Sequence, residues 1–253
     1  AATGRPGPVV VDIPKDMTTP NERYEYSYPK KVKLRSYNPA VRGHAGQIKK
    51  AVDMLMAAKR PVIYAGGGVI LGKASSQLTE LTRTLGFPIT NTLMGIGCYP
   101  ATDKQHLGWL GMHGTYEANM AMHHSDLILC VGARFDDRVT NATEKFCPGA
   151  RIIHIDIDRN ELNKNKMVTL PICADLGTAL RQLIDCALPR PTEKWLTYLR
   201  KLRSDFPYSL GRDEGLSPQK AIAVLSEATD GEAIISLGVG QHQMWAMQHY
   251  QSR

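Results

Sequence analysis

The chain has 253 residues, of which 43% are hydrophobic and 22% charged, and no run of about 18 apolar residues occurs, so we expect a globular protein without a membrane span. The net charge is +7, but the basic residues are scattered and the motifs of nucleic-acid-binding modules are missing, which disfavours nucleic acid as a partner. The five cysteines form no CxxC pair, which favours reduced thiols in a cytoplasmic protein over a disulfide framework or a zinc site.

The first part of the chain predicts the end of one domain. Residues 8–14 form an apolar run bounded by prolines, which is typical of a buried parallel strand. Residues 15–40 are rich in Pro, Tyr, Lys and Asn without a clear period and predict a linker. We therefore assign residues 1–35 to the end of a preceding domain and its linker, and we expect the chain to be an internal piece of a longer protein.

Alternating strand and helix patterns follow. Apolar runs predict strands at residues 61–65, 87–90, 127–132, 151–156 and 168–172. Amphipathic patterns predict helices at residues 47–58, 75–85, 115–122 and 176–188. This order predicts an α/β fold over residues 36–190, a doubly wound parallel sheet of Rossmann-like type whose ligands bind outside the carboxyl ends of the strands.

The pattern changes after residue 190. We expect a linker over residues 191–216 that contains a charged amphipathic helix at 192–206. Residues 217–253 are predicted to start a further domain. There Ser217 and Pro218 are typical of a helix start, and a strand at 233–237 leads to a strand-to-turn junction at 238–242.

Three glycines, Gly66, Gly67 and Gly68, predict a tight turn between a strand and a helix. Small residues there would let a phosphate approach the backbone and the helix N-terminus. The dinucleotide fingerprint would require Gly at position 71, where Leu71 stands. A tight turn without a ligand is therefore an equally good explanation.

A glycine-punctuated loop, residues 110–115, precedes another predicted helix. His113 could donate to a phosphate or a flavin edge, although a lone histidine in a loop is more often structural. Met112 is by default a core residue.

Residues 132–139 follow a buried strand and contain two arginines and two aspartates within five positions. These side chains could form a surface ion network. Arginine also suits carboxylate and phosphate groups because its donors form a planar fork, and a site for a small 2-keto acid would need such a group.

Acidic residues follow the next predicted strand. Asp156 could accept the ribose hydroxyls of a nucleotide, whereas Asp158 and Asp175 could equally cap helices. No Ser-His-Asp arrangement or metal-ligand spacing is recognisable, so we predict no metal site in this chain and derive no reaction from residue order alone.

Three motifs in this order resemble acetolactate (acetohydroxyacid) synthase large catalytic subunits: residues 110–114, 132–140 and 239–245. Residues 4–16 resemble the end of the first domain of the wider family of thiamine-diphosphate enzymes. The resemblance implies the six-stranded middle domain of these enzymes. It also implies the condensation of two pyruvates, or of pyruvate with 2-ketobutyrate, with loss of CO2, in branched-chain amino-acid biosynthesis.

The resemblance also implies cofactor sites. FAD would be contacted by a set drawn from the whole chain: Arg5, Gly66, Gly67, Gly68, Met112, His113, Gly114, Gly132, Ala133, Arg134, Asp136, Asp156, Ile157, Asn160, Asp175, Gln243 and Met244. Val239, Gly240, Gln241 and His242 would begin the thiamine diphosphate cradle. Arg138 would bind the carboxylate of the second keto acid, and Met112 would flank the substrate channel.

The implied partners are a second catalytic subunit, in a homodimer or tetramer, and a small regulatory subunit. The family's catalytic glutamate and its Mg2+-binding motif are expected outside these residues, so the isolated chain is expected to be inactive. The family usually has Gly after Thr140, whereas this chain has Asn141, so the backbone is expected to turn differently there.

Three alternatives remain. Another thiamine-diphosphate decarboxylase or oxidase would share the fold but would not normally carry the arginine-rich motif at 132–139. A free-standing NAD-binding module of sirtuin type would need no strand at 8–14. A non-enzymatic regulatory or scaffold domain that evolved from the middle domain would fit if the gene encodes only these residues.

Overall fold

The computed structural model describes residues 1–20, 23, 25–31, 34–208 and 215–252. Six parallel strands form one sheet in the order β3-β2-β1-β4-β5-β6. The strands are β1 (Pro61–Ala65), β2 (Ile89–Asn91), β3 (His106–Trp109), β4 (Leu127–Val131), β5 (Arg151–Asp156) and β6 (Leu170–Cys173). The predicted doubly wound sheet is confirmed, and the order of its strands reverses between β1 and β4, the position where such sheets bind ligands.

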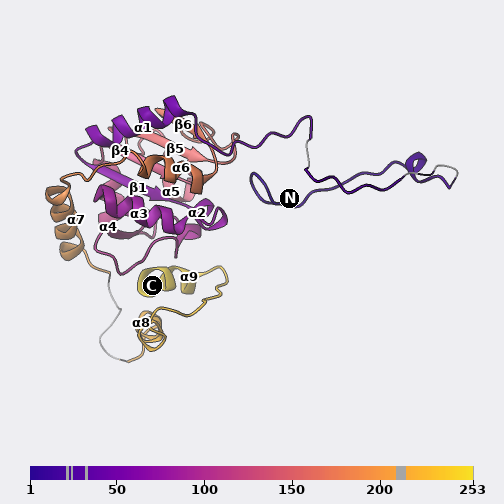
Figure 1. The fold of residues 1–253 in the computed structure, drawn as a ribbon. Coiled ribbons are helices and arrows are strands. Elements are labelled where there is room, and N and C mark those ends of the chain that lie inside the picture. Colours follow the sequence, from indigo (N-terminus) through magenta and orange to yellow (C-terminus); the bar gives the residue numbers. More distant parts are fainter. Residues whose placement is uncertain (21–22, 24, 32–33, 209–214, 253) are drawn as a thin grey trace.

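Helices cover both faces of the sheet (Figure 1). One core lies under α1 (Ala45–Ala57), α3 (Ser75–Leu85) and α6 (Leu176–Ile184), and the other under α4 (Tyr116–His124) and α7 (Glu193–Asp205). Because successive strand residues point to opposite faces, Ile63 packs in the first core and Tyr64 in the second. Burial on both faces explains why these strands are continuous apolar runs.

Local signals fix the starts of the elements near the carboxyl edge of the sheet. The short helix α2 (Gly67–Leu71) begins inside the glycine turn that follows β1. The short helix α5 (Asp137–Thr140) is capped by Asp136, whose side chain accepts from the Arg138 amide. Such caps satisfy the free N–H groups of a first helical turn.

The strand β3 was not predicted from the sequence. It pairs with β2, with Ile89 opposite His106, and lies at the edge of the sheet. His106 and Gly108 interrupt its apolar pattern, so its four residues do not stand out as a strand.

Two other expectations were wrong. Residues 8–14 form no strand, because none of the described strands pairs with them, and Val10 is 91% exposed. Residues 233–237 likewise lie outside any strand. In Figure 1 the N-terminal segment extends away from the sheet before it returns to α1.

The helix predicted to start at Ser217 and Pro218 is confirmed. Of the strand-to-turn junction expected at residues 238–242, residues 241–242 instead begin a helix. Helices α8 (Pro218–Ala228) and α9 (Gln241–His249) pack against each other, and α9 lies beside β3. Two short 3-10 turns complete the elements, η1 (Lys15–Thr18) and η2 (Leu93–Gly95). The predicted linkers include residues 21–22, 24, 32–33 and 209–214, which lie outside the described residues.

All five cysteines are free. Among the described residues, no helix is long and apolar enough to span a bilayer.

Candidate functional site

A cavity of about 920 Å³ opens at the carboxyl ends of β1, β4 and β5, where the strand order reverses. Its walls come from segments far apart in the chain: residues 2–6, 39–41, 64–73, 92–94, 132–139, 156–161 and 175–176. Twelve predicted ligand residues lie together on these walls: Arg5, Gly66, Gly67, Gly68, Gly132, Ala133, Arg134, Asp136, Arg138, Asp156, Ile157 and Asp175.

The glycine turn after β1 interlocks with the turn after β4. The Gly66 amide donates to the Val131 carbonyl oxygen, and the Gly68 amide donates to the Gly132 carbonyl oxygen, each over 3.0 Å. A Cβ added to Gly68 would lie 2.7 Å from the Gly132 Cα. Gly66 and Gly68 are therefore required by backbone packing, whereas a Cβ on Gly67 would lie 3.0 Å from the Met94 Cβ on the cavity wall.

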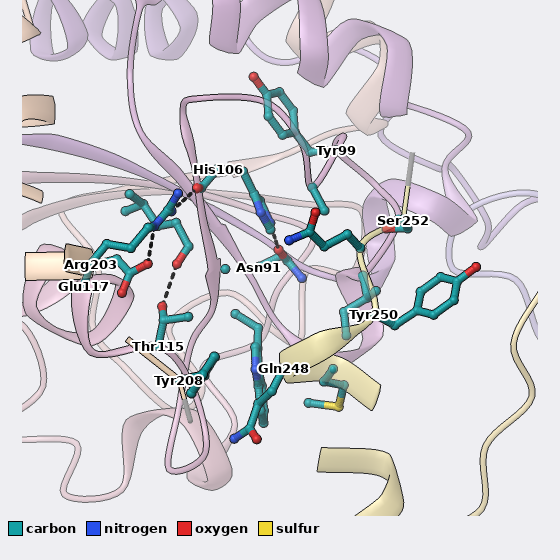
Figure 2. Close-up of a pocket in the computed structure, with 18 of the residues that line it drawn as sticks. Asn91, Tyr99, His106, Thr115, Glu117, Arg203, Tyr208, Gln248, Tyr250 and Ser252 are labelled. Atoms are coloured by element: carbon teal, nitrogen blue, oxygen red, sulfur yellow. Dashed lines mark hydrogen bonds and ion pairs between the residues drawn. The ribbon is translucent and has the colours of Figure 1, made fainter. Parts of the chain in front are cut away.

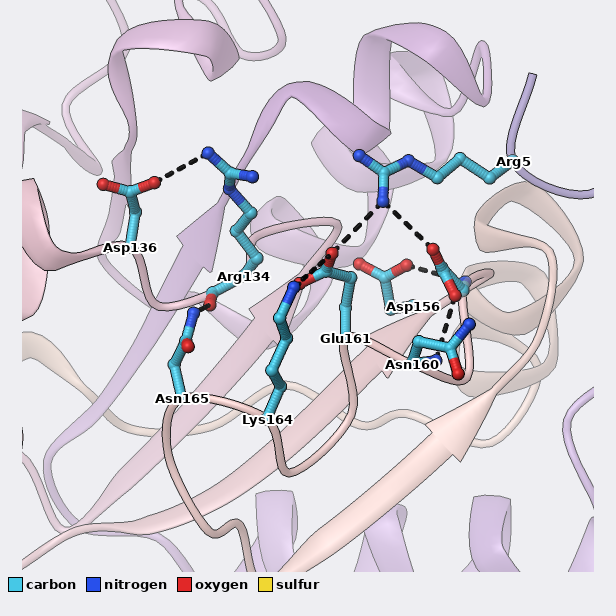
Figure 3. A network of polar contacts seen from close by, with 9 residues as sticks. Arg5, Arg134, Asp136, Asp156, Asn160, Glu161, Lys164 and Asn165 are labelled. Carbon is cyan, nitrogen blue, oxygen red and sulfur yellow. Dashed lines mark hydrogen bonds and ion pairs between the residues drawn. The ribbon is translucent and has the colours of Figure 1, made fainter. Parts of the chain in front are cut away.

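The loop after β4 presents two arginines to the cavity. Arg134 donates to the Asp136 carboxylate over 2.7 Å, and Asn165 donates to the Arg134 carbonyl oxygen over 2.9 Å (Figure 3). The Arg138 amide and the Arg134 guanidinium lower the pKa of Asp136 below its usual range. The Arg134–Asp136 ion pair thus forms part of the predicted ion network.

Arg138 differs from Arg134 because its guanidinium makes only one long ion pair among the described residues. Its side chain is 82% exposed and lies 3.9 Å from Asp137, which is itself exposed. Such a pair contributes about 0–1 kcal/mol in water. The Arg138 donors therefore remain available to an anion in the cavity.

Acidic side chains, those of Asp156 and Glu161, line a further part of the cavity. Asp156 ends β5, and one of its oxygens accepts from the Asp158 amide over 2.8 Å. Burial raises the pKa of Asp156, and the Asp158 and Glu161 carboxylates raise it further, whereas Arg5 acts in the opposite direction. One carboxylate oxygen of Asp156 is thus left for a donor on a ligand.

Arg5 closes this acidic wall from the N-terminal segment. It donates to Asp158 over 3.0 Å and to Glu161 over 3.1 Å (Figure 3). The Asn160 amide and Arg5 together lower the pKa of Asp158. Asn160 itself does not line the cavity, and its backbone amide donates to the Asp158 carboxylate over 2.9 Å.

Asp175 has both of the roles considered for it. Its carboxylate caps α6 by accepting from the Thr178 amide over 2.9 Å, and the residue also lines the cavity. Because the cap uses the Oδ1 atom, Oδ2 remains for a ligand.

The loop of Met112, His113 and Gly114 lies beside the cavity but not on its walls. A Cβ on Gly111 would lie 3.0 Å from the Arg138 carbonyl oxygen, which places the two loops side by side. Met112 is 70% exposed and is therefore not a core residue. The loop is thus next to Arg138, where a substrate channel was predicted.

The predicted contacts from the C-terminal part are not brought to this cavity. None of Val239, Gly240, Gln241, His242, Gln243 and Met244 lines it. They occupy the start of α9 and the residues before it, and Val239 is 95% exposed. Their assignment to cofactors stays a prediction.

A second cavity, of about 250 Å³, lies between β3 and α9 (Figure 2). Its polar groups are mostly paired. His106 contacts Asn91 over 2.7 Å, and Arg203 donates to Glu117 over 2.6 Å. Burial lowers the pKa of His106 to about 4, so its ring is neutral at neutral pH.

Several wall residues of the larger cavity were missed from the sequence. Leu93 and Met94 come from the 3-10 turn after β2, and Lys73 lies in the turn after α2 with a φ of 51°. Carboxyl ends of neighbouring parallel strands meet at one edge, so the residues just after β2 could have been found by this rule. Among the described residues, no group of three His, Cys, Asp or Glu side chains could hold a metal ion.

Comparison with known proteins identifies the family. Residues 48–183, more than half of the chain, match the family model described as the thiamine pyrophosphate enzyme, central domain. The chain is 49% identical to the acetolactate synthase large subunit of Haemophilus influenzae, over 99% of this chain and 45% of that protein. It is 44% identical to the acetolactate synthase isozyme 3 large subunit of Escherichia coli, with the same coverage.

The acetolactate synthase large subunit of Corynebacterium glutamicum is 43% identical, over 98% of this chain and 40% of that protein. The chain therefore spans less than half the length of these relatives. The matches confirm the predicted resemblance and do not support a sirtuin-type module. The chain belongs to the family of thiamine pyrophosphate enzymes and contains their central domain.

Proposed function

We propose that the large cavity binds FAD. The observation that carries this proposal is the meeting of twelve predicted nucleotide and substrate residues around one cavity of about 920 Å³. Pockets for small molecules typically measure about 300–1,000 Å³, so this volume suits a dinucleotide better than a three-carbon keto acid.

The chemistry of the walls fits the parts of FAD. Asp156 and Asp175 each have a free carboxylate oxygen that could accept from ribose hydroxyls. Arg134 offers donors that suit phosphate oxygens. Leu93 and Met94 supply apolar and thioether surface for an aromatic ring.

We propose further that the whole protein is an acetolactate synthase, as its relatives are named. It would condense two pyruvates, or pyruvate and 2-ketobutyrate, with loss of CO2, in branched-chain amino-acid biosynthesis. Thiamine pyrophosphate with Mg2+ would supply the acyl-carbanion chemistry when bound. The relatives' names favour this reaction over that of other thiamine-dependent decarboxylases and oxidases.

Arg138 is the residue of this chain that we assign to the substrate. The residue lines the cavity, its nearest ion pair among the described residues is 3.9 Å long, and a planar guanidinium matches a carboxylate in a bidentate manner. Arg138 would thus bind and orient the carboxylate of the second keto acid, while Met112 would flank its path.

The proposed assembly follows from the same relatives, which are large subunits. We propose a homodimer or tetramer of catalytic subunits that joins a small regulatory subunit in the cytoplasm.

Calorimetric titration of the purified chain with FAD, NAD and thiamine pyrophosphate tests the proposed site. We expect saturable binding of FAD with one equivalent per chain and no saturable binding of the other two. Preference for NAD, or absence of FAD binding, would contradict the proposal.

A further inference from the structure

Phe135 interrupts the row of residues that the loop after β4 presents to the large cavity. Arg134 and Asp136, on either side of it, line the cavity, but Phe135 does not. Its side chain is 2% exposed and its φ is 52°. A positive φ is unfavourable for a bulky side chain, so the surrounding structure must hold it.

The ring of Phe135 lies in a socket formed by Tyr64, Phe146 and His154. The ring centroids are 5.7 Å, 6.2 Å and 5.3 Å away, respectively. The ring of His154 meets that of Phe135 edge to face, at an interplanar angle of 84°. Tyr64 and His154 belong to β1 and β5, which both lie inside the sheet rather than at its edges, so the socket is part of the sheet.

Backbone contacts hold this stretch only weakly. In the described part of the chain, no backbone N–H of residues 133–136 donates to a backbone carbonyl oxygen. Three carbonyl oxygens accept from side chains: that of Ala133 from the Cys130 thiol over 3.3 Å, that of Arg134 from Asn165 over 2.9 Å, and that of Asp136 from the Thr140 hydroxyl over 3.1 Å. Of these, only the contact with Cys130 reaches a strand of the sheet. The buried ring is therefore the main link between the loop and the sheet.

The geometry points to Phe135 as a positioning residue for ligand binding: its ring, seated in the socket, fixes the direction in which Arg134 enters the cavity. Arg134 is one residue away and reaches the cavity beside Asp136, to which it donates over 2.7 Å. This inference rests on the proposed function, because its ligand is the flavin nucleotide. Without the ring, the loop can adopt other conformations, and ordering the loop on binding then reduces the observed affinity for FAD.

A double-mutant cycle distinguishes positioning from general stability. FAD dissociation constants would be measured by flavin fluorescence for the wild type, Phe135→Leu, Arg134→Ala and the double variant. We expect Phe135→Leu to weaken FAD binding about tenfold in the wild-type background. In the Arg134→Ala background the same change should cost less than about threefold, because residues that act through one another are not additive.

Phe87→Leu is the matched control, since Phe87 is fully buried in the other core and does not line the cavity. We expect it to lower the melting temperature about as much as Phe135→Leu does, with FAD affinity within about twofold of the wild type. Phe135→Met retains apolar bulk without a ring, so it provides a second variant if Phe135→Leu does not fold. We expect it to weaken FAD binding about threefold.

The inference would be overturned, while the proposed FAD site stands, if Phe135→Leu weakened FAD binding equally in the wild-type and Arg134→Ala backgrounds. The same holds if Phe87→Leu weakened FAD binding as much as Phe135→Leu, or if FAD affinity were unchanged in Phe135→Leu or Phe135→Met. Failure of the wild type to bind FAD would overturn both.

Discussion

Gly68 and Gly132 lie back to back at the point where the strand order of the sheet reverses. The Gly68 amide donates to the Gly132 carbonyl oxygen over 3.0 Å, and the Cα of each lies within 2.8 Å of the position that a Cβ on the other would occupy. The turns that follow β1 and β4 are thus joined directly through their backbones, and together they form the floor of the cavity.

Gly68→Ala should destabilise the protein because the added methyl overlaps backbone atoms that cannot move separately. We expect a loss of about 1–3 kcal/mol, and more for Gly132→Ala, whose φ of +59° also disfavours a side chain. Thermal unfolding measures the loss. Gly149→Ala, at an exposed position with open space around its Cβ, is the control and should change stability by less than about 0.5 kcal/mol. Equal melting temperatures for Gly68→Ala and Gly149→Ala would disprove the backbone contact.

Asn141→Gly should stabilise the protein. Asn141 follows α5 with φ 50° and ψ −107°, a conformation that glycine adopts with less strain. We expect a gain of about 0.5–1 kcal/mol, which corresponds to a rise of about 1–4 °C in melting temperature. Asn163→Gly is the matched control: Asn163 has φ 62°, but its side chain accepts from the Val168 amide over 2.9 Å. An unchanged or lower melting temperature for Asn141→Gly would refute the strain at this position.

Asp156→Asn should increase stability at neutral pH and weaken FAD binding. Burial raises the pKa of Asp156, so the folded state holds the proton more tightly than the unfolded state, and stability falls as the pH rises through the folded pKa. The amide removes this cost. Its gain in melting temperature should disappear as the pH falls to the ordinary carboxyl pKa of about 3.9. FAD affinity should fall about tenfold, since a charged acceptor for ribose is lost.

The control for this change is Asp158→Asn, two residues away. The Asn160 amide and Arg5 lower the pKa of Asp158, so its ionised form stabilises the fold. Asp158→Asn should therefore lower the melting temperature at neutral pH, and this loss should vanish as the pH falls below the folded pKa. If Asp156→Asn and Asp158→Asn changed the melting temperature at neutral pH in the same direction, the electrostatic account would be contradicted.

Arg138→Ala should leave the fold intact and impair the use of the keto acid. The side chain is exposed and weakly paired, so the free energy of unfolding should change by less than about 0.5 kcal/mol. In the complete enzyme we expect the KM for the keto acid to rise about 10–100-fold, the equivalent of about 1.5–3 kcal/mol for a charged hydrogen bond. Arg151→Ala is the control. Arg151 begins β5, whereas the cavity lies at the carboxyl end of that strand, so the variant removes the same charge outside the cavity and should not change the KM. A KM that stays unchanged in Arg138→Ala would remove Arg138 from the substrate site.

The fold could be predicted from the sequence where burial on both faces produces continuous apolar runs, as in residues 61–65 and 127–131. The strand at residues 106–109 could not, because His106 and Gly108 break the run and pairing with β2 supplies the missing stabilisation. Residues 8–14 show the converse, since their apolar pattern fits a strand but no neighbour pairs with it.

The candidate site was predictable to the extent that strand order determines it. Asp156 ends β5 and Arg134 follows the neighbouring strand β4, so the sheet brings them to one edge. Phe135 was not singled out, because its role depends on a positive φ and on contacts to other strands that no local pattern encodes. The sequence could not decide whether the glycine turn binds a ligand, because backbone packing alone already requires Gly66 and Gly68.

The most direct test of the central claim is amide hydrogen exchange of the chain with and without FAD. We predict slower exchange on FAD binding in residues 66–73 and 132–139, the two turns on the floor of the large cavity, and unchanged exchange in residues 97–109 around the small one. Protection confined to residues 97–109 and 247–252, or no change in any segment, would contradict the assignment of the flavin nucleotide to this edge of the sheet.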